Sequence, residues 1–508
     1  MTMNAQMIKL KVDNAVTYIN PPIKGQIYAE FKQKLGYKPQ DALWMAQANS
    51  HWDGWVTTVC YGSGKCRCPN KKSEMHFPTG LLSSAREFFD KNKIEYTIED
   101  IRPVIEGLRP LGVSDKFSTR DYQQEAIENA VKKQRGIIRA ATGAGKTYIA
   151  GSIIARVGAF PVCFFVTTKD LLYQAKEELE KLITEDGKAV AIGVVGAGKC
   201  DIKDINIVTV QTAIRSLGVK FDKFDDEDGG DDCDDVSSDD SKREKIKNLI
   251  VNSKMIICDE CQHWAASTCQ VISDFSSSAR YRYGISATPW RDMDDDLLID
   301  ACFGKILSDI SASTLIEKKI LVQPKIYFVH TKTKVGGTYA DVYRKIIVEN
   351  VYRNTVIKNL AEQMMNDGRQ TLILVRQIAH GEILQDMIPG SIFLHGSIAS
   401  KKRQSTINKM KEGKHRCVIA SSIFDEGVDV RPLSALILAG AGKSQTRALQ
   451  RIGRVIRAYD GKKDAIVIDF FDDSKYLRKH SQARRKIYRT EPKFEISDIE
   501  MDTNGQDE

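Results

Sequence analysis

The sequence predicts an α/β fold in which two parallel-sheet domains follow each other and a small α+β domain precedes them. Short runs of β-branched and aromatic residues alternate with charged, helix-like stretches from about residue 118 onward, which is typical of parallel strands connected by helices. The same rhythm restarts after about residue 324, which indicates a second sheet. A chain of 508 residues, 42% of them hydrophobic, is long and apolar enough for about three domains with full-sized cores.

The first sheet is expected within residues 116–314 and the second within residues 315–490. The strand-like runs of the first are Gly136–Ala140, Val162–Thr167, Ile205–Gln211, Met255–Cys258 and Tyr281–Ser286. Those of the second are Lys325–Val329, Thr371–Val375, Ile392–Leu394, Cys417–Ala420, Ala435–Leu438 and Ala465–Phe470. Residues Leu315–Pro324 are the expected joint between the two domains.

Residues 1–115 follow another pattern and predict an accessory α+β domain, with a helix-like stretch at Leu81–Asn92 and a strand-like one at Ile94–Ile98. Four residues of this region could be read as zinc ligands: Cys60, Cys66, Cys68 and His76. Their spacing does not match the Cys-x₂₋₄-Cys pairs of structural zinc sites, so a zinc site is the less favoured interpretation.

Charge divides the sequence into segments. Asp222–Asp240 contains eleven acidic residues and one lysine, which predicts a disordered insertion, with mimicry of nucleic acid as the less favoured alternative. Lys475–Arg489 predicts a basic helix, and residues 491–508 predict an acidic flexible tail. The chain as a whole carries a formal charge of +8, so its remainder is strongly basic and nucleic acid is the partner to expect. A generally basic enzyme is the alternative on charge alone.

Several classes of protein are excluded by composition. No apolar run approaches the roughly 18 residues of a membrane span, and the N-terminal residues lack the apolar core of a signal peptide. Eleven cysteines are too sparse for a disulfide scaffold, and several lie in strand-like runs. We therefore expect a cytoplasmic protein with reduced cysteines and no membrane partner.

A phosphate-binding loop is predicted between the strand-like run Gly136–Ala140 and a helix expected at Tyr148–Arg156. Glycines at such a place let backbone N–H groups close around phosphate oxygens at a helix N-terminus. Lys146 would reach the β and γ phosphates of ATP, and Thr147 would ligate Mg²⁺. The residues assigned to this loop are Thr142, Gly143, Ala144, Gly145, Lys146 and Thr147.

Two carboxylates follow the buried strand-like run Met255–Cys258. Because parallel strands deliver their carboxyl ends to one edge of the sheet, Asp259 and Glu260 are expected beside the phosphate-binding loop. We assign Asp259 to the magnesium ion and Glu260 to activation of the attacking water.

With these residues in order, the sequence resembles superfamily 2 (DExH/D-box) helicases over about residues 118 to 472. Asp259 to Gln262 resembles the DExH/D box, although Gln262 replaces the usual fourth residue. Tyr122 and Gln123 resemble the adenine-reading glutamine motif. Ser286 and Thr288 belong to a segment that matches the coupling motif. Residues that resemble segments in contact with the nucleic-acid backbone are Thr168, Gln174, Gln211 and Thr212.

The resemblance continues in the second domain and implies two RecA-like domains. Residues 450–457 match the arginine-finger helix, with Gln450 as a coupling residue and Arg454 and Arg457 as the fingers. Arginines spaced three apart lie on one helical face and can hold a γ phosphate. Gly427 and Asp429 match a motif that meets both nucleotide and strand. His395, Gly396 and Arg403 resemble a further backbone-contact segment.

Within the superfamily the sequence resembles UvsW-type bacteriophage helicases, including short strings near Trp52 and Phe77 of the accessory domain. This resemblance implies an ATP-dependent DNA helicase that unwinds forks, Holliday junctions or R-loops and drives branch migration in recombination, repair or replication restart. It also implies a phage-infected host cytoplasm and replication or recombination proteins as partners. A monomer is expected, because nothing in the sequence demands a larger assembly. The alternatives are an RNA helicase, a motor subunit of a restriction or nuclease complex, and a nucleic-acid scaffold with an inactive ATPase site.

Overall fold

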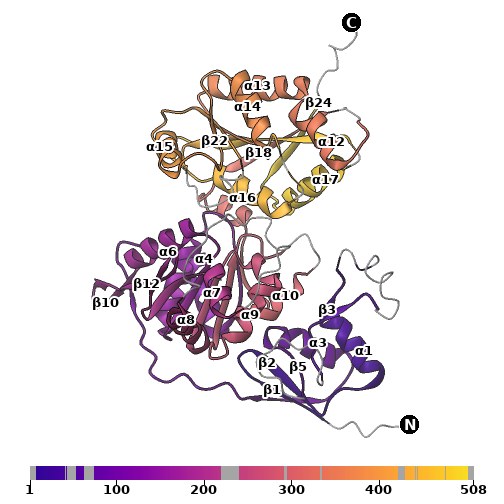
Figure 1. Cartoon of the computed structure of the whole chain (residues 1–508), viewed down its shortest axis with the longest axis vertical. Coiled ribbons are helices and arrows are strands. Elements are labelled where there is room, and N and C mark those ends of the chain that lie inside the picture. Colours follow the sequence, from indigo (N-terminus) through magenta and orange to yellow (C-terminus); the bar gives the residue numbers. More distant parts are fainter. Residues whose placement is uncertain are drawn as a thin grey trace. The chain divides into compact units, whose positions relative to one another are not determined.

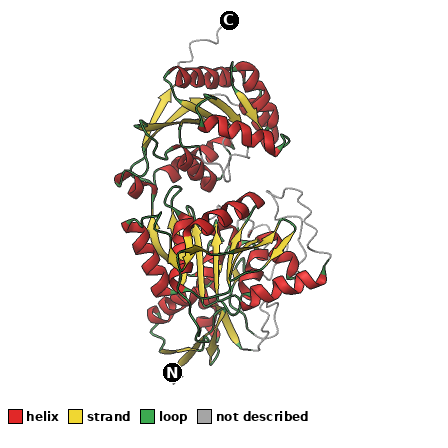
Figure 2. Cartoon of the chain, turned by 90° about the vertical axis from the view of Figure 1, so that its left-hand side faces the viewer, coloured by secondary structure: helices red, strands yellow, loops and turns green. Residues whose placement is uncertain are grey.

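The computed structural model describes residues 7–39, 42, 53–61, 74–218, 239–290, 295–331, 335–421, 430–440, 442, 444–474 and 476–500. The chain divides into two compact units, one ending at Asp309 and one beginning at Ile310, with the short segment 141–144 grouped with the second. Large, mostly parallel sheets between helices confirm the predicted α/β class (Figures 1 and 2). No helix in the described ranges is long and apolar enough to cross a membrane.

The accessory domain is built on a four-stranded sheet in the order β5-β2-β1-β6. Its strands are β1 (Ile8–Val12), β2 (Val16–Asn20), β5 (Met75–Pro78) and β6 (Tyr96–Asp100), and its helices are α1 (Gly25–Lys34), η1 (Thr79–Leu81) and α3 (Leu82–Lys91). Four aromatic rings, Phe31, Phe77, Phe88 and Phe89, pack together between the helices and the sheet. The expected helix is thus confirmed as α3, and the expected strand begins two residues late, at Tyr96. A further pair, β3 (Gly36–Tyr37) with β4 (Val56–Thr57), stands apart.

The accessory domain packs directly on the first parallel-sheet domain within the same unit. Arg135 donates a hydrogen bond to the carbonyl oxygen of Asn14, and the Asn14 amide donates to the carbonyl oxygen of Ser277 over 3.1 Å. At Gly80 the two domains approach so closely that a Cβ would collide with the carbonyl oxygens of Asp300 and Ala301. The contact therefore requires glycine at position 80.

We expect Gly80→Ala to destabilise this unit by roughly 2 kcal/mol or more, because the backbone of the neighbouring helix must move to admit a methyl group. Denaturant unfolding measures the change. Gly336→Ala is the matched control, since a Cβ there meets nothing within 4 Å. Equal stability of the two variants would contradict the close packing described at Gly80.

The first large sheet has eight strands in the order β13-β12-β14-β9-β15-β16-β8-β17. They are β8 (Arg135–Ala140), β9 (Val162–Val166), β12 (Ile192–Gly196), β13 (Lys199–Asp201), β14 (Ile205–Thr209), β15 (Met255–Asp259), β16 (Tyr281–Ser286) and β17 (Ile306–Ile310). Every predicted strand of this domain is confirmed. The strands β12, β13 and β17 were not foreseen.

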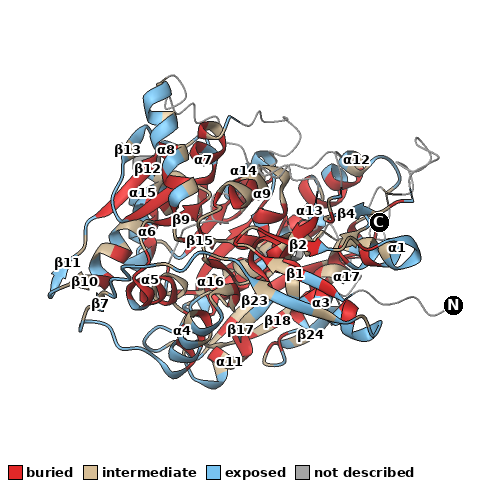
Figure 3. Ribbon diagram, turned by 90° about the horizontal axis from the view of Figure 1, so that it is seen from below, coloured by how far each residue is buried: buried red, intermediate tan, exposed pale blue. Residues whose placement is uncertain are grey.

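Helices cover both faces of this sheet, and Figure 3 shows its strands among the buried residues. The helices are α4 (Asp121–Lys133), α5 (Lys146–Val157), α6 (Lys169–Leu182), α7 (Val210–Ser216), α8 (Asp240–Asn252), η3 (Cys261–Ala265), α9 (Ser267–Phe275) and α10 (Leu297–Phe303). Side chains of β9, β14 and β12 are buried throughout, as parallel strands covered on both faces require. A small sheet of β7 (Gly112–Val113), β10 (Ile183–Glu185) and β11 (Lys188–Ala189) lies outside it.

The second large sheet has seven strands, all parallel, in the order β20-β21-β19-β22-β23-β18-β24. They are β18 (Gln323–Thr331), β19 (Gln370–Leu374), β20 (Ile392–Leu394), β21 (Cys417–Ala420), β22 (Leu433–Ile437), β23 (Asp464–Asp472) and β24 (Glu495–Glu500). The helices are α11 (Ala312–Glu317), α12 (Tyr339–Tyr343), α13 (Val351–Asn366), α14 (Ile378–Met387), α15 (Ser400–Lys411), α16 (Gln445–Val455) and α17 (Leu477–Tyr488), with a π-helical turn, η4 (Arg344–Val348). The six predicted strands and the basic helix α17 are confirmed.

Two expectations about segments are corrected. The expected acidic tail begins too early at 491, because β24 pairs in parallel with β18 and Glu491 accepts hydrogen bonds from the amide and hydroxyl groups of Ser313. The expected insertion extends too far at its end, because Asp239 caps α8 and Asp240 begins it. Residues 219–238 and 501–508 lie outside the described residues.

Candidate active site

Five adjacent parallel strands, β14, β9, β15, β16 and β8, end at one edge of the first sheet. The segments that follow these strands contain most of the site residues proposed for the first domain. The edge therefore gathers the loop after β8, the carboxylates at the end of β15 and the coupling segment after β16.

The loop after β8 adopts a conformation that only glycine accepts easily. Gly143 has φ +93° and Gly145 has φ +84°, both in the left-handed region that side chains disfavour. A Cβ at Gly145 would also lie 2.6 Å from Nε2 of Gln123. Because α5 begins at Lys146, its first backbone N–H groups have no partner within the helix and can bind an anion.

Lys146 lies against two carboxylates, those of Asp259, the last residue of β15, and of Glu260, the residue after it. Its ammonium group donates to Oε1 of Glu260 and lies 3.8 Å from Oδ1 of Asp259. Burial acts to lower the pKa of Lys146, but the two carboxylates outweigh burial and hold this pKa above its ordinary value. Lysine and carboxylates from segments more than 100 residues apart are therefore gathered in one place.

The two carboxylates have different electrostatic environments. Burial raises the pKa of Asp259 to about 6, and the attraction of Lys146 offsets only part of this effect. Burial also acts to raise the pKa of Glu260, but the Lys146 charge and hydrogen bonds from Lys146 and Gln262 bring it below its ordinary value. Glu260 is therefore held in its charged form, the form in which a carboxylate can accept a proton from water, and the contact with Lys146 makes it a weaker base.

Gln262 connects the carboxylates to the coupling segment. Its amide nitrogen donates to Oε2 of Glu260 over 3.0 Å, and its amide oxygen accepts from the hydroxyl group of Ser286 over 2.6 Å. The hydroxyl oxygen of Ser286 in turn accepts from the backbone N–H of Thr288 over 3.0 Å. Gln262, the unusual fourth residue of the box, thus joins the two motifs, and the Ser286 hydroxyl group also donates directly to Oε2 of Glu260 over 3.4 Å.

Gln123 and Tyr122 lie in the first turn of α4, beside the phosphate-binding loop. The Gln123 side-chain oxygen accepts a hydrogen bond from the backbone N–H of Arg120 over 3.0 Å, and its nitrogen faces Gly145. Tyr122 is buried and accepts from the guanidinium group of Arg120. These contacts fix the orientation of the Gln123 amide.

Two aromatic residues near this glutamine were not selected from the sequence. The Phe117 and Tyr148 rings lie 6.2 Å apart, and the Tyr148 hydroxyl group hydrogen-bonds Thr119. Phe117 is 42% exposed, so its ring can accept a flat ligand. The sequence signal that could have identified Phe117 is its position, since it is an aromatic residue shortly before the glutamine motif.

The proposed nucleic-acid residues of the first domain differ in exposure. Gln174 and Gln211 are exposed, and the Gln211 amide donates to the carbonyl oxygen of Thr167 over 2.9 Å. Thr168 caps α6 through its hydroxyl oxygen. Thr212 is only 3% exposed and shares a hydrogen bond with Thr209, so its hydroxyl group is used inside the domain.

In the second unit, the structure brings some site residues together and separates others. Arg403 donates to the carbonyl oxygen of Gly396 over 3.2 Å, next to His395. Gln450 and Arg454 lie on α16, whereas Arg457 follows the end of that helix and forms a β-bridge with Leu321. The two arginines are therefore not on one helical face, because α16 ends at Val455. Gly427 and Asp429 lie outside the described residues.

Cys60 and His76, two of the four zinc candidates, lie opposite each other in an antiparallel bridge. The His76 Nδ1 atom hydrogen-bonds the carbonyl oxygen of Glu74 over 2.9 Å. Cys66, Cys68 and Trp52 fall outside the described residues. Within the described part of the chain, no three His, Cys, Asp or Glu side chains gather as a metal site.

Comparisons with known families match both large domains. Residues 116–291 match the family described as "Type III restriction enzyme, res subunit", and residues 353–459 match "Helicase conserved C-terminal domain". Together these two matches span more than half of the chain.

Individual relatives extend the likeness. The "DNA 3'-5' translocase XPB2" of Sulfurisphaera tokodaii is 26% identical over 437 residues, covering 77% of this chain and 90% of the relative. The "ATP-dependent DNA helicase uvsW" of Enterobacteria phage T4 is 22% identical over 468 residues, covering 86% and 85%. A fragment of a putative HsdR subunit of a type I restriction enzyme from Vibrio vulnificus YJ016 has a similar fold, with a TM-score of 0.53, 18% identity and coverage of 75% and 68%.

Proposed function

This chain belongs to superfamily 2 of the helicases as an ATP-dependent DNA helicase, and from that premise we propose that it couples ATP hydrolysis to branch migration and unwinding of branched DNA. The observation that supports the ATPase part of the proposal is the group formed by Lys146, Asp259 and Glu260 beside the glycine loop. The branched-DNA part is supported by an accessory domain packed on the first helicase domain, which adds a second surface near the motor.

In the proposed reaction, ATP is bound with its phosphates at the N-terminus of α5. Lys146 neutralises charge on the β and γ phosphates, and the Gln123 amide with the Phe117 ring holds the adenine by hydrogen bonding and stacking. Thr147 and Asp259 are oxygen donors of the kind Mg²⁺ prefers, and this ion would supply charge neutralisation at the phosphates. Glu260 orients the attacking water and accepts its proton.

Hydrolysis is proposed to be communicated to DNA through the hydrogen bonds around Gln262. A change at Glu260 alters the Gln262 amide, and through it Ser286 and the segment that ends in Thr288. The arginines Arg454 and Arg457 are proposed to complete the hydrolytic site when the two helicase domains close. His395, Gly396, Arg403, Gln174 and Gln211 are proposed contacts to the nucleic-acid backbone.

The variants Gln262→Ala and Ser286→Ala are expected to separate ATP hydrolysis from unwinding. Gln262→Ala removes the two hydrogen bonds that Gln262 makes to Glu260 and Ser286. Ser286→Ala removes the hydroxyl group that donates to Gln262 and, over 3.4 Å, to Glu260. Both variants leave the side chains of Lys146, Asp259 and Glu260 in place. We expect unwinding to fall roughly 5- to 30-fold while DNA-stimulated ATPase changes less, as for coupling energies of about 1–2 kcal/mol. Parallel loss of both activities in both variants would contradict the assignment of a coupling role.

The branched-DNA proposal is tested by unwinding assays on forks, Holliday junctions, R-loops and linear duplexes of equal length. We expect faster turnover of the branched substrates than of linear duplex at the same ATPase rate. Equal rates on all four would contradict branch migration while leaving the helicase activity itself intact. Stronger ATPase stimulation by RNA than by DNA would likewise overturn the proposed substrate.

A further inference from the structure

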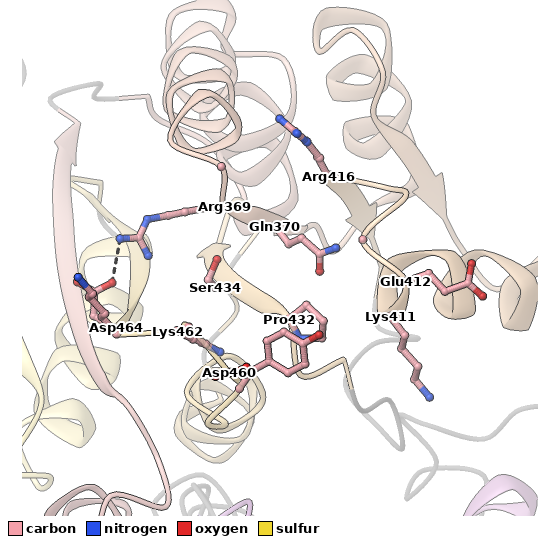
Figure 4. A pocket seen from close by; sticks show the side chains of 15 residues that line it. Arg369, Gln370, Lys411, Glu412, Arg416, Pro432, Ser434, Asp460, Lys462 and Asp464 are labelled. Atoms are coloured by element: carbon pink, nitrogen blue, oxygen red, sulfur yellow. Dashed lines mark hydrogen bonds and ion pairs between the residues drawn. The ribbon is translucent and has the colours of Figure 1, made fainter.

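A cavity of about 690 Å³ opens at the amino-terminal edge of the second sheet (Figure 4). Its walls come from the segments that enter β19, β21, β22 and β23, which are four adjacent parallel strands. The proposed DNA contacts His395 and Gly396 follow the carboxyl end of β20, at the opposite edge of the same sheet. The cavity is therefore distinct from the motifs assigned above.

Some cations of this cavity are committed to the protein itself. Arg369 forms an ion pair with Asp464 over 2.8 Å, drawn as a dashed line in Figure 4. Lys462 donates to the carbonyl oxygens of Leu433 and Arg457, the latter over 2.9 Å. These contacts hold the walls of the cavity in place. The positive charge that could bind a ligand therefore has to come from other residues.

Three further cations, Lys411, Arg416 and Lys463, line the cavity and are exposed. Among the described residues, no ion-pair partner lies within 4.0 Å of any of them. Because these charges come from the end of α15, from the segment before β21 and from the segment before β23, they line the cavity from more than one side. Such an arrangement attracts an anion that offers several oxygens.

The acidic residues of the cavity do not cancel this charge. Glu412 is paired with Lys414 over 2.6 Å, and Asp464 is held by Arg369 and by Lys325. Asp460 is exposed, and no ion pair joins it to another described residue. Three available cations against one available carboxylate leave a positive excess.

An aromatic side chain and a basic helix indicate which anion fits. Tyr459 lines the cavity and is 49% exposed, so its ring can stack on a base. The helix α15, which ends at Lys411, carries the exposed lysines Lys402 and Lys409. The positive surface therefore continues beyond a cavity whose volume suits one nucleotide.

We propose that this cavity is a second DNA-binding site, which binds the phosphodiester backbone of a strand through Lys411, Arg416 and Lys463 and stacks a base on Tyr459. The proposal rests on the proposed function, because it assigns a further DNA contact to the same motor. A continuous strand fits the extended charge along α15 better than a free nucleotide does, since a nucleotide would occupy the cavity alone.

The test uses the full-length protein with the triple change Lys411→Gln, Arg416→Gln and Lys463→Gln. Affinity for a single-stranded oligonucleotide is measured by fluorescence anisotropy at several salt concentrations. We expect affinity near 0.1 M salt to fall about 10-fold or more, and the slope of log affinity against log salt to shrink by about 2, the value for two to three lost phosphate contacts. Tyr459→Ala is expected to weaken binding without changing this slope, because the ring carries no charge.

The matched control removes the same charge elsewhere, with Lys132→Gln, Lys133→Gln and Lys345→Gln, all exposed residues. If the Lys411, Arg416 and Lys463 triple variant has the same slope of log affinity against log salt as this control variant, the proposal is overturned. Titration of ATP into the Lys146→Ala variant, with and without the triple change, tests a free nucleotide. If ATP binds there and the triple change removes it while DNA affinity stays, the site is a nucleotide site and the DNA proposal is wrong. Fork unwinding by the unchanged protein in the same preparation tests the proposed function separately.

Discussion

Replacing Lys146 with alanine is expected to reduce ATP turnover by about 10²- to 10³-fold or to background, with DNA affinity changed little. The reason is the position of its ammonium group against Glu260 and Asp259 at the start of α5, where charge develops on the transferred phosphate. Steady-state ATPase with saturating DNA and anisotropy with labelled DNA measure the two properties.

Lys199 provides a matched control within the same domain. Residues 193–199 also contain glycines followed by lysine, but Lys199 lies in the β12–β13 hairpin, with its ammonium group 5.1 Å from the centre of the Tyr173 ring. We expect Lys199→Ala to retain ATP turnover within about twofold, the range of an ordinary surface substitution. Equal losses in the two variants, or a parallel loss of DNA affinity in Lys146→Ala, would contradict the assignment of the loop.

Arg454→Ala is expected to lower DNA-stimulated ATPase by about 10³- to 10⁵-fold, the range for arginine fingers in other nucleotide hydrolases. The physical reason is that a planar guanidinium group neutralises charge on the γ phosphate as it leaves. ATP binding, measured with a fluorescent analogue, should remain, because the phosphate loop and Gln123 lie in the other helicase domain.

Arg457→Ala distinguishes the two proposed fingers. Arg457 follows the end of α16, and its backbone bridges Leu321, so a smaller effect there than at Arg454 is expected. Arg489→Ala, which removes an exposed arginine just after α17, is the control for loss of positive charge. If ATPase activity survives in both Arg454→Ala and Arg457→Ala, the assignment of these two arginines to the hydrolytic site is wrong.

The strands of both sheets could be predicted because parallel strands buried on two faces give short apolar runs between charged helices. Four strands of these sheets could not: β12, β13, β17 and β24. In β17 the adjacent polar residues Ser308 and Asp309 interrupt the apolar run, and β24 includes Glu495, Asp498 and Glu500. Pairing at one edge of a sheet is decided by the neighbouring strand, and a single sequence contains no signal for that neighbour.

The candidate site was predictable for the same reason. Once β8 and β15 were recognised as parallel strands, the geometry of a sheet placed Lys146 beside Asp259 and Glu260. The role of Gln262 was harder to predict from the sequence. A glutamine can donate and accept hydrogen bonds at the same time only if its two partners lie at suitable distances. Thr212 shows the converse, since its motif position gave no indication that its hydroxyl group is buried against Thr209.

The pairing of β24 with β18 gives the second helicase domain a protected border. Without these last residues, the nine-residue strand β18 would present a long row of unpaired backbone groups to any passing chain, which invites aggregation. The shorter strand β24 covers this edge, and its Asp498 is held in place by His330 of β18 and Arg485 of α17. The pairing therefore closes a sheet edge that would otherwise be open to strand addition by another chain.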